Sequence, residues 1–229
     1  MSLYAISDIH LSFGTDKSMD IFSGWENYIE RLQENWKKKI CNDDTVVVAG
    51  DISWASTLDD SLSDFKFLEL LPGKKVIMRG NHDYWWSTKR KVELFFKENN
   101  FLSLHILHNC AIPFGKYCIC GTRGWTCFPE TAQDKKILSR EIGRLKISLD
   151  FAKNANLKPI VFLHYPPICN SNASSQVVNL LIQEGIDKCY YGHIHGDRFI
   201  KNRSFTEYRD IKFGLLSADS LNFEPIKIV

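Results

Sequence analysis

The sequence has no apolar run that approaches the roughly 18 residues required for a membrane-spanning helix. It also has no marked excess of one charge, because 29 basic and 27 acidic side chains leave a net charge of +2. A balance this mild does not indicate a nucleic-acid-binding surface. The first residues lack the basic segment and long apolar stretch of a secretory signal. We therefore expect a cytoplasmic protein with no membrane partner, for which nucleic acid matters only as a substrate.

Repeats, low-complexity tracts and linker-like segments are also missing, which predicts a single domain over residues 1–229. With 44% hydrophobic residues, this length suffices for one substantial core. The seven cysteines are odd in number and form no Cys-x-x-Cys pair. We expect reduced and mostly buried thiols. Nothing in the sequence indicates an oligomeric state.

What the sequence does contain is an alternation of short apolar runs with longer segments of helical periodicity. The runs are rich in Val and Ile, as in Val46-Val47-Val48, which suggests strands buried on both faces. Strands are predicted at residues 3–7, 45–49, 75–79, 117–121, 160–163, 188–191, 213–217 and 225–228. Helices are predicted at residues 22–40, 58–71, 87–99, 132–155 and 174–184. This order predicts an α/β domain.

The predicted helix at 132–155 has two distinct faces. One carries an apolar stripe that includes Leu138, Leu145 and Leu149 at helical spacing. The opposite face is charged, and we interpret it as a solvated surface made of Lys135, Lys136, Arg140, Glu141, Arg144 and Lys146.

Five short polar segments each follow an apolar, strand-like run. They are Asp8-Ile9-His10, Gly50-Asp51, Gly80-Asn81-His82-Asp83, His164-Tyr165-Pro166-Pro167 and Gly192-His193-Ile194-His195. In α/β sheets, ligands collect at the carboxyl ends of the strands. Imidazoles, carboxylates and an amide gathered at such an edge are the groups that a site for two divalent metals requires.

Each segment alone also has a structural explanation. An acidic residue or a histidine at a strand end can be a turn, a helix cap or an ordinary hydrogen-bonding group. Gly80-Asn81-His82-Asp83 is the most specific segment, because a simple turn does not need an amide, an imidazole and a carboxylate in succession. Taken together, the five segments favour metal binding. His105 and His108 match no segment, and we interpret them as ordinary polar residues.

In this order, the segments resemble the hallmark motifs of the calcineurin-like metallophosphoesterases over nearly the whole chain. The resemblance implies two stacked mixed β-sheets flanked by helices, a four-layer α/β sandwich. It also implies two divalent metal ions, one held by Asp8, His10, Asp51 and His195 and the other by Asp51, Asn81, His164 and His193. Mixed imidazole and carboxylate ligands suit Mn, Fe or Zn better than Mg or Ca. His82 would stay unligated near the scissile phosphate, with its ring oriented by Asp83.

One segment departs from the family pattern. Many members continue the second motif as Gly-Asp-x-x-Asp, whereas this chain reads Gly50-Asp51-Ile52-Ser53-Trp54. The missing acid is not a direct metal ligand, so the departure leaves metal binding intact. It does prevent the assignment of the chain to a well-known subgroup.

The expected function is the hydrolysis of phosphate esters by attack of metal-bound hydroxide, with His82 as general acid. A nuclease or a cyclic-nucleotide phosphodiesterase would use the same site and is the alternative within the enzyme class. A non-catalytic metal-binding scaffold is the alternative outside it. The presence of His82 and of every expected ligand disfavours the scaffold. The natural substrate is not indicated.

Four residues near these segments are predicted to contact the substrate. Arg123 lies between two glycines after a strand-like run, and a guanidinium group suits bidentate phosphate binding. A structural ion pair is the alternative for Arg123. Trp54, Trp85 and Trp86 follow polar segments and would wall the pocket or stack on a base. A position in the core is their alternative.

Overall fold

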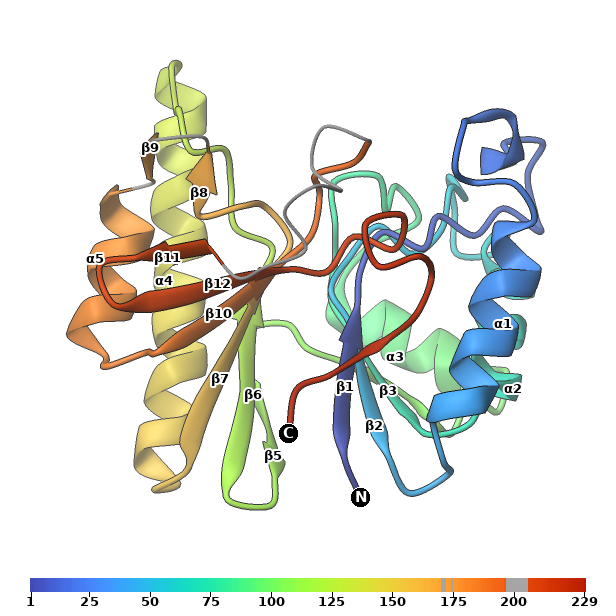
Figure 1. Ribbon diagram of the computed structural model, residues 1–229, viewed down its shortest axis with the longest axis horizontal. Helices are drawn as coiled ribbons and strands as arrows, with labels where there is room; N and C mark the ends of the chain where they lie inside the picture. The colour runs from blue at the N-terminus through green and yellow to red at the C-terminus, as the bar shows by residue number, and fades with distance from the viewer. Residues whose placement is uncertain (170–171, 174, 197–205) are drawn as a thin grey trace.

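The computed structural model describes residues 1–169, 172–173, 175–196 and 206–229. Among these residues, two mixed β-sheets of five and six strands stack against each other, and helices cover the outer side of each sheet (Figure 1). The chain builds the first sheet before it enters the second, and then returns to the first sheet as strand β13 (Ile226–Lys227). The predicted four-layer α/β sandwich is confirmed.

The first sheet has the strand order β13-β1-β2-β3-β4, in which β1 to β4 run parallel and β13 is antiparallel to β1. The parallel strands are β1 (Leu3–Ile6), β2 (Thr45–Val48), β3 (Lys74–Ile77) and β4 (Leu104–Ile106). All residues of β2 are buried, as expected for a strand covered on both faces. Strand β4 was not predicted, because three residues are too short to give a clear periodicity.

The second sheet has the strand order β11-β12-β10-β7-β6-β5. Its strands are β5 (Ala111–Phe114), β6 (Tyr117–Thr122), β7 (Lys158–Leu163), β10 (Lys188–Tyr191), β11 (Thr206–Tyr208) and β12 (Ile211–Leu215). The four inner strands are parallel, and β5 and β11 pair antiparallel at the edges. A separate short hairpin joins β8 (Ile168–Cys169) and β9 (Asn172–Ala173).

Helices form the two outer layers (Figure 1). The first sheet is flanked by α1 (Tyr28–Lys39), α2 (Leu62–Leu70) and α3 (Lys89–Glu98), with a short 3-10 helix, η1 (Met19–Ile21), before them. The second sheet is flanked by α4 (Ala132–Asn154) and α5 (Ser175–Gln183). Helix α1 begins at Tyr28 rather than at residue 22, because Gly24 (φ 87°) and Asn27 (φ 52°) adopt left-handed conformations that a continuous helix excludes.

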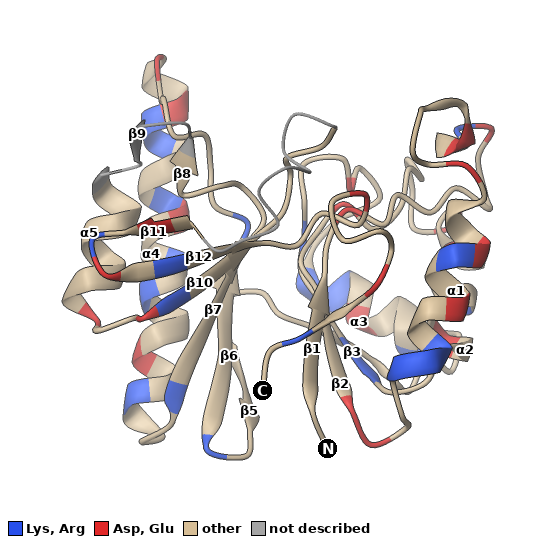
Figure 2. Cartoon of the chain, in the orientation of Figure 1, with Lys and Arg blue, Asp and Glu red and all other residues tan. Residues whose placement is uncertain are grey.

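Helix α4 confirms the predicted apolar stripe and corrects the prediction for the opposite face. Thr131 and Asp134 form a capping box at its start, and Leu138 is among the residues buried against the second sheet. Charged residues of both signs are distributed along the helix (Figure 2). Glu141 is not part of a solvated surface, however, because it is only 1% exposed. Arg144, one turn on, is half-buried.

Three apolar layers hold the sandwich together. One lies between the first sheet and helices α1 to α3, one between the two sheets, and one between the second sheet and helices α4 and α5. No described helix combines the length and the apolar character needed to cross a membrane.

The cysteines only partly match the expectation of reduced thiols. Free thiols are found at Cys41, Cys110, Cys118, Cys120 and Cys189. The expectation is wrong at Cys127, which is disulfide-bonded. The side chain of Cys169 lies outside the described part of the chain.

Candidate metal centre

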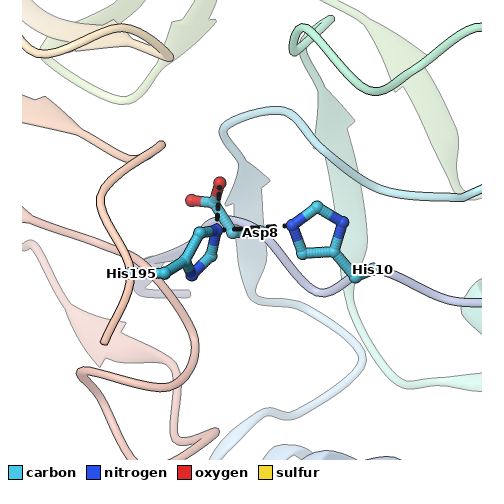
Figure 3. Close-up of side chains that lie close together, drawn as sticks. All are labelled: Asp8, His10 and His195. Atoms are coloured by element: carbon cyan, nitrogen blue, oxygen red, sulfur yellow. Dashed lines mark hydrogen bonds and ion pairs between the residues drawn. The ribbon is translucent and has the colours of Figure 1, made fainter. Parts of the chain in front are cut away.

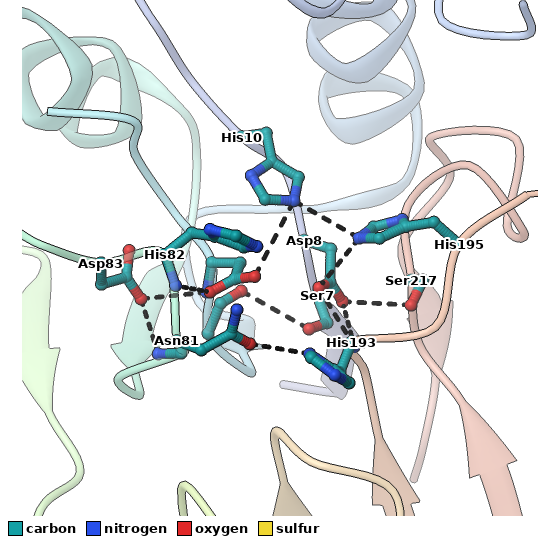
Figure 4. Close-up of polar contacts among 12 residues, drawn as sticks. Ser7, Asp8, His10, Asn81, His82, Asp83, His193, His195 and Ser217 are labelled. Carbon is teal, nitrogen blue, oxygen red and sulfur yellow. Dashed lines mark hydrogen bonds and ion pairs between the residues drawn. The ribbon is translucent and has the colours of Figure 1, made fainter. Parts of the chain in front are cut away.

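The carboxyl ends of five strands meet at one edge of the two sheets and carry all the predicted ligand residues. Asp8 and His10 follow β1, Asp51 follows β2, Asn81 follows β3, His164 follows β7, and His193 and His195 follow β10. The side chains of Asp8, His10, Asn81, His193 and His195 converge on one region (Figure 4). Asp51 lies beside His10 and His164 beside Asn81 in the same region. The first sheet supplies four of these residues and the second sheet supplies three, so the site lies where the two sheets meet.

Asp8, His10 and His195 form the first group, and their side chains face one another (Figure 3). The Nε2 atom of His195 lies 3.3 Å from Oδ1 of Asp8 and 3.3 Å from Nε2 of His10. Two ligands that each lie roughly 2.0–2.1 Å from a tetrahedrally bound ion are about 3.4 Å apart. The spacing of this group therefore fits a single small cation.

Asp51, His164 and His193 form the second group. The side-chain oxygen of Asn81 belongs with them, because it lies 2.7 Å from Nε2 of His164 and 2.7 Å from Nδ1 of His193. His164 Nε2 also lies 3.5 Å from Oδ1 of Asp51. This combination of carboxylate, amide oxygen and two imidazoles suits a divalent transition metal.

Asp51 lies between the two groups. Its Oδ1 atom faces His164 and accepts the backbone N–H of His82 at 2.8 Å. Its Oδ2 atom is 3.9 Å from Nε2 of His10 in the other group. This Oδ2 atom is buried and has no hydrogen-bond partner among the described residues. A buried carboxylate oxygen without a partner is costly, so this arrangement fits a cation on each side of Asp51.

Two of the imidazoles are oriented by hydrogen bonds from the ring nitrogen that points away from the site. Nδ1 of His164 lies 3.0 Å from the carbonyl oxygen of Ala49, which can only accept, so this nitrogen carries the proton. Nδ1 of His195 lies 3.1 Å from Oδ1 of Asp219. Both contacts leave Nε2 free to coordinate, which is the usual way in which proteins orient a metal-binding histidine.

The backbone at this edge is held in conformations that most residues avoid. Asp8 (φ 58°), His10 (φ 44°), Asp51 (φ 51°) and His193 (φ 72°) all have positive φ angles. Such conformations cost free energy and persist only where the surrounding structure enforces them. Here they turn the ligands inward at the ends of the strands.

Glycine next to a ligand permits the close approach of neighbouring strand ends, both between the two sheets and within the first sheet. A Cβ atom added at Gly192 would lie 2.0 Å from Oγ of Ser7 and 2.4 Å from Oδ2 of Asp8. A Cβ atom at Gly80 would lie 2.1 Å from Oδ1 of Asp51. Only glycine fits at these positions without displacing a ligand residue.

Burial and mutual repulsion of the carboxylates control protonation in the metal-free site. Burial, followed by the charge of Asp8, raises the pKa of Asp51 to about 9. Burial also acts on Asp8, but the hydrogen bond and charge of His195 outweigh it and hold the pKa of Asp8 far below its usual range. Burial lowers the pKa of His10 to about 3 and that of His164 to about 4. Both rings are therefore neutral at pH 7, the form that binds metal.

His82 lies beside the two groups and belongs to neither. Its ring centroid is 4.6 Å from that of Trp54 and 5.8 Å from that of His10. Nδ1 of His82 is 3.4 Å from the hydroxyl of Tyr84, which is 56% exposed. The imidazole is thus next to the ligands and on the side that opens towards solvent.

Asp83 does not orient the ring of His82, and this prediction is wrong. The carboxylate of Asp83 instead accepts backbone N–H groups from Asp51 (2.9 Å) and Gly80 (2.6 Å), and the indole N–H of Trp85 (2.9 Å). Because its oxygens are engaged with two loops and an indole, Asp83 fixes the positions of these loops rather than the orientation of the imidazole.

The four predicted substrate contacts divide into two pairs. Trp54 is half-buried, and its ring stacks on His10 with centroids 4.7 Å apart. Arg123 is half-buried, and its guanidinium group lies 4.7 Å from the ring centroid of Trp125. Trp85 (2% exposed) and Trp86 (8% exposed) are part of the core beside the first sheet. The prediction that these two residues face the substrate is therefore wrong, because the core conceals both rings.

The structure adds two residues that the sequence did not identify. The hydroxyl of Ser217 donates to Oδ2 of Asp8 at 3.1 Å, and Asp219 contacts the ring of His195. Both follow β12, which is parallel to β10 and ends at the same edge. The predicted strand at 213–217 gave a signal for them, since Ser217 is its last residue and Asp219 follows it, and polar residues at that end of the strand reach the same edge.

Comparisons with known proteins agree with this architecture. The sequence matches the family model of the calcineurin-like phosphoesterases over residues 1–197. No curated protein matches the chain.

Several solved structures share the fold at low sequence identity. A phosphopantetheinyl hydrolase from Mycobacterium tuberculosis has a TM-score of 0.60 at 14% identity, covering 100% of this chain and 95% of that one. A Thermus thermophilus protein has a TM-score of 0.56 at 13% identity, covering 99% and 97%. A protein of unknown function from Aquifex aeolicus has a TM-score of 0.51 at 19% identity, covering 99% and 95%. With the family match over most of its length and two groups of residues that are able to hold metal, the chain belongs to the calcineurin-like phosphoesterases, a metal-dependent family.

Proposed function

We propose that the protein hydrolyses phosphate esters with the help of two divalent metal ions, one held by each ligand group. The observation that carries this proposal is the position of Asp51, whose two carboxylate oxygens face different groups. When bound, the two cations would neutralise charge on the phosphoryl oxygens and make water nucleophilic near neutral pH. Mn, Fe and Zn all suit these ligands.

His82 is proposed to protonate the leaving oxygen of the ester. Its ring lies beside the ligand groups but is not a member of either group, and its half-buried position leaves it accessible to a substrate. The hydroxyl of Tyr84 is close enough to hold Nδ1, so that Nε2 faces away from Tyr84. General acid catalysis of this kind typically contributes about 10²- to 10⁴-fold to the rate.

Trp54 is proposed to form one wall of the substrate site. Its ring lies against both His10 and His82, so it covers the side of the site where the ligands and the general acid meet. Its stacking on His10 would also keep that imidazole in place.

The choice between phosphomonoesters and phosphodiesters, including nucleic acid and cyclic nucleotides, depends on the loops around this site. One protein of the same fold is named for the hydrolysis of a phosphopantetheinyl group, which supports ester hydrolysis on this architecture.

The test is a panel of chromogenic monoesters and diesters assayed with added Mn²⁺, Fe²⁺ or Zn²⁺. We expect turnover that requires the metal and stops with a chelator. A metal-loaded protein that turns over no member of the panel would favour the non-catalytic scaffold.

A further inference from the structure

A small polar pocket lies where the ends of β3 and β6 approach helix α4. Its volume is about 180 Å³. Pockets that take whole drug-sized ligands are typically about 300–1,000 Å³, so this one suits a small ion or one group of a larger molecule. We call it the arginine pocket, because its charged lining consists of Arg79, Arg123, Arg140, Arg144 and Glu141.

Positive charge in the arginine pocket is not balanced. Glu141 is the single carboxylate in the lining, and it already accepts the Thr122 hydroxyl at 2.5 Å and the Arg144 guanidinium at 2.6 Å. Among the described residues, Arg144 is the only one of the four arginines in an ion pair. The buried Nε of Arg79 has no hydrogen-bond partner there either. Three guanidinium groups thus have donors to offer, and those of Arg79 and Arg123 are half-buried, whereas that of Arg140 is exposed.

His108, which also lines the pocket, responds to this charge. Burial, followed by the charge of Arg144, lowers the pKa of His108 to about 4. Lys89 and Arg79 act in the same direction, and Glu141 opposes them. The imidazole is therefore neutral at pH 7 and is able to report on any anion that enters.

The chemistry of the lining selects an oxyanion. Cationic groups that are partly removed from water and lack partners are unfavourable unless a counter-charge joins them. Guanidinium groups present paired N–H donors that match phosphate or carboxylate oxygens. Several such groups around a small volume favour phosphate, which offers more acceptor oxygens and more negative charge than a carboxylate.

The arginine pocket is connected through the backbone to loops of the metal centre. Arg79 immediately precedes the segment that carries Asn81 and His82. The carbonyl oxygen of Arg123 accepts the backbone N–H groups of His164 at 3.1 Å and Tyr165 at 2.8 Å. Two of the four arginines are therefore attached to the loops that present the second ligand group.

We propose that the arginine pocket binds a phosphate-sized oxyanion, and that this oxyanion is a second phosphoryl group of the substrate, separate from the scissile ester. The second part of this inference rests on the proposed function. It narrows the substrate class to esters that carry two phosphoryl groups. Arg123, predicted to contact substrate phosphate, would do so here rather than at the metals.

The binding of the anion is tested by NMR titration of His108 in the metal-loaded protein, with inorganic phosphate as the probe. An anion in contact with the ring should raise the pKa of His108 by about one unit or more. His105 is exposed, does not line the pocket, and serves as an internal reference. Arg79→Gln and Arg140→Gln should each weaken the phosphate response at least tenfold, whereas Lys136→Gln, on α4 but outside the pocket lining, should not. A pKa of His108 that phosphate leaves unchanged would overturn the inference.

The role in substrate binding is tested by comparing two aryl phosphates that differ only in a second phosphoryl group. In the Arg140→Gln protein, the ratio of kcat/KM for the doubly phosphorylated ester to kcat/KM for the simple ester should fall at least tenfold. Lys136→Gln should leave this ratio unchanged. A normal ratio in Arg140→Gln would overturn the substrate role even if phosphate moves His108. A protein inactive on both esters would contradict the proposed function, while the NMR titration would still decide whether the pocket binds an anion.

Discussion

At the residue scale, Asp51 is the position on which both ligand groups depend. We expect Asp51→Asn to lower the metal content at both positions, because the amide offers one neutral oxygen where the carboxylate offers two charged ones. The fold should survive, since the asparagine oxygen still accepts the N–H of His82. Elemental analysis of the purified variant measures the effect. Asp43→Asn, a change of the same chemistry at an exposed position, is the control. Normal metal content in Asp51→Asn would exclude a shared ligand.

His82 should affect turnover but not metal binding. We expect His82→Ala to retain its metals and to lose about 10²- to 10⁴-fold in kcat, because the leaving oxygen would no longer receive a proton from the protein. The loss should be largest for esters with poor leaving groups, which need the proton most. Steady-state kinetics over a series of aryl phosphates measures this dependence. An equal loss across the series would assign His82 to another role.

Single residues differ in how well the sequence predicted their roles. The ligands were predictable because each follows an apolar run that ends at the same edge of a sheet. The sequence could not show that Asp83 leaves the ring of His82 alone, because a carboxylate next to an imidazole in sequence can turn towards backbone N–H groups instead, as Asp83 does. The sequence likewise did not indicate that Trp85 is buried, since an aromatic residue after a polar segment is compatible with a position in the core or in the wall of a pocket.

At the scale of elements, Asp83 connects the loop after β3 with the loop after β2. It accepts the N–H groups of Gly80 on one loop and of Asp51 and Ile52 on the other. We expect Asp83→Asn to reduce the free energy of unfolding by about 1–3 kcal/mol, because the amide nitrogen would face backbone donors in a buried position. Urea denaturation measures this loss. Metal affinity should fall as well. A variant with unchanged stability and unchanged metal affinity would show that the two loops keep their positions without the hydrogen bonds of Asp83.

Lys75, in strand β3, links this strand to the segment that follows helix α2. Its buried ammonium group donates to the carbonyl oxygens of Leu71 at 2.7 Å and Gly73 at 2.9 Å. Burial lowers the pKa of Lys75 to about 8, from 10.5. The unfolded chain therefore binds more protons between these pH values, and the folded state gains stability as pH rises through this window.

Comparison with Lys75→Met, which does not titrate at this position, isolates the effect. Relative to this variant, the wild type should gain about 1 kcal/mol in free energy of unfolding for each unit between pH 8 and 10. Urea denaturation at several pH values measures the difference. A difference that stays constant with pH would mean that Lys75 keeps its ordinary pKa in the folded protein.

Whole elements were predicted best where one physical signal dominates. The valine run of β2 and the long stripe of α4 gave strands and helices close to their observed bounds. Short elements such as β4 gave too little pattern, and the left-handed residues before α1 interrupted a stripe that the sequence alone would continue. The buried position of Glu141 was hidden for a related reason. A charge on a helix face is predicted to be solvated unless its partners, here Thr122 and Arg144, are known.

At the scale of the whole molecule, both ligand groups combine residues from the two sheets. Asp8 follows β1 in the first sheet and His195 follows β10 in the second, and Asp51 and His164 are divided in the same way. Bound cations would therefore join the sheets at one edge, in addition to the apolar layer between them. A ligand that binds only the folded state at about 100 times its Kd adds about 2.7 kcal/mol to stability.

Removal of the metals should consequently destabilise the entire sandwich. For a chain of this length, each kcal/mol corresponds to roughly 2–4 °C in Tm, so one occupied site at that concentration is worth about 5–10 °C. Thermal denaturation of the metal-loaded protein with and without a chelator measures the shift. Asp51→Asn should show a much smaller shift, because it would hold less metal at the start. If the chelator removed the metals from the wild type and left its Tm unchanged, the ions would not link the two sheets, and the ligand groups would be local features of the strand ends.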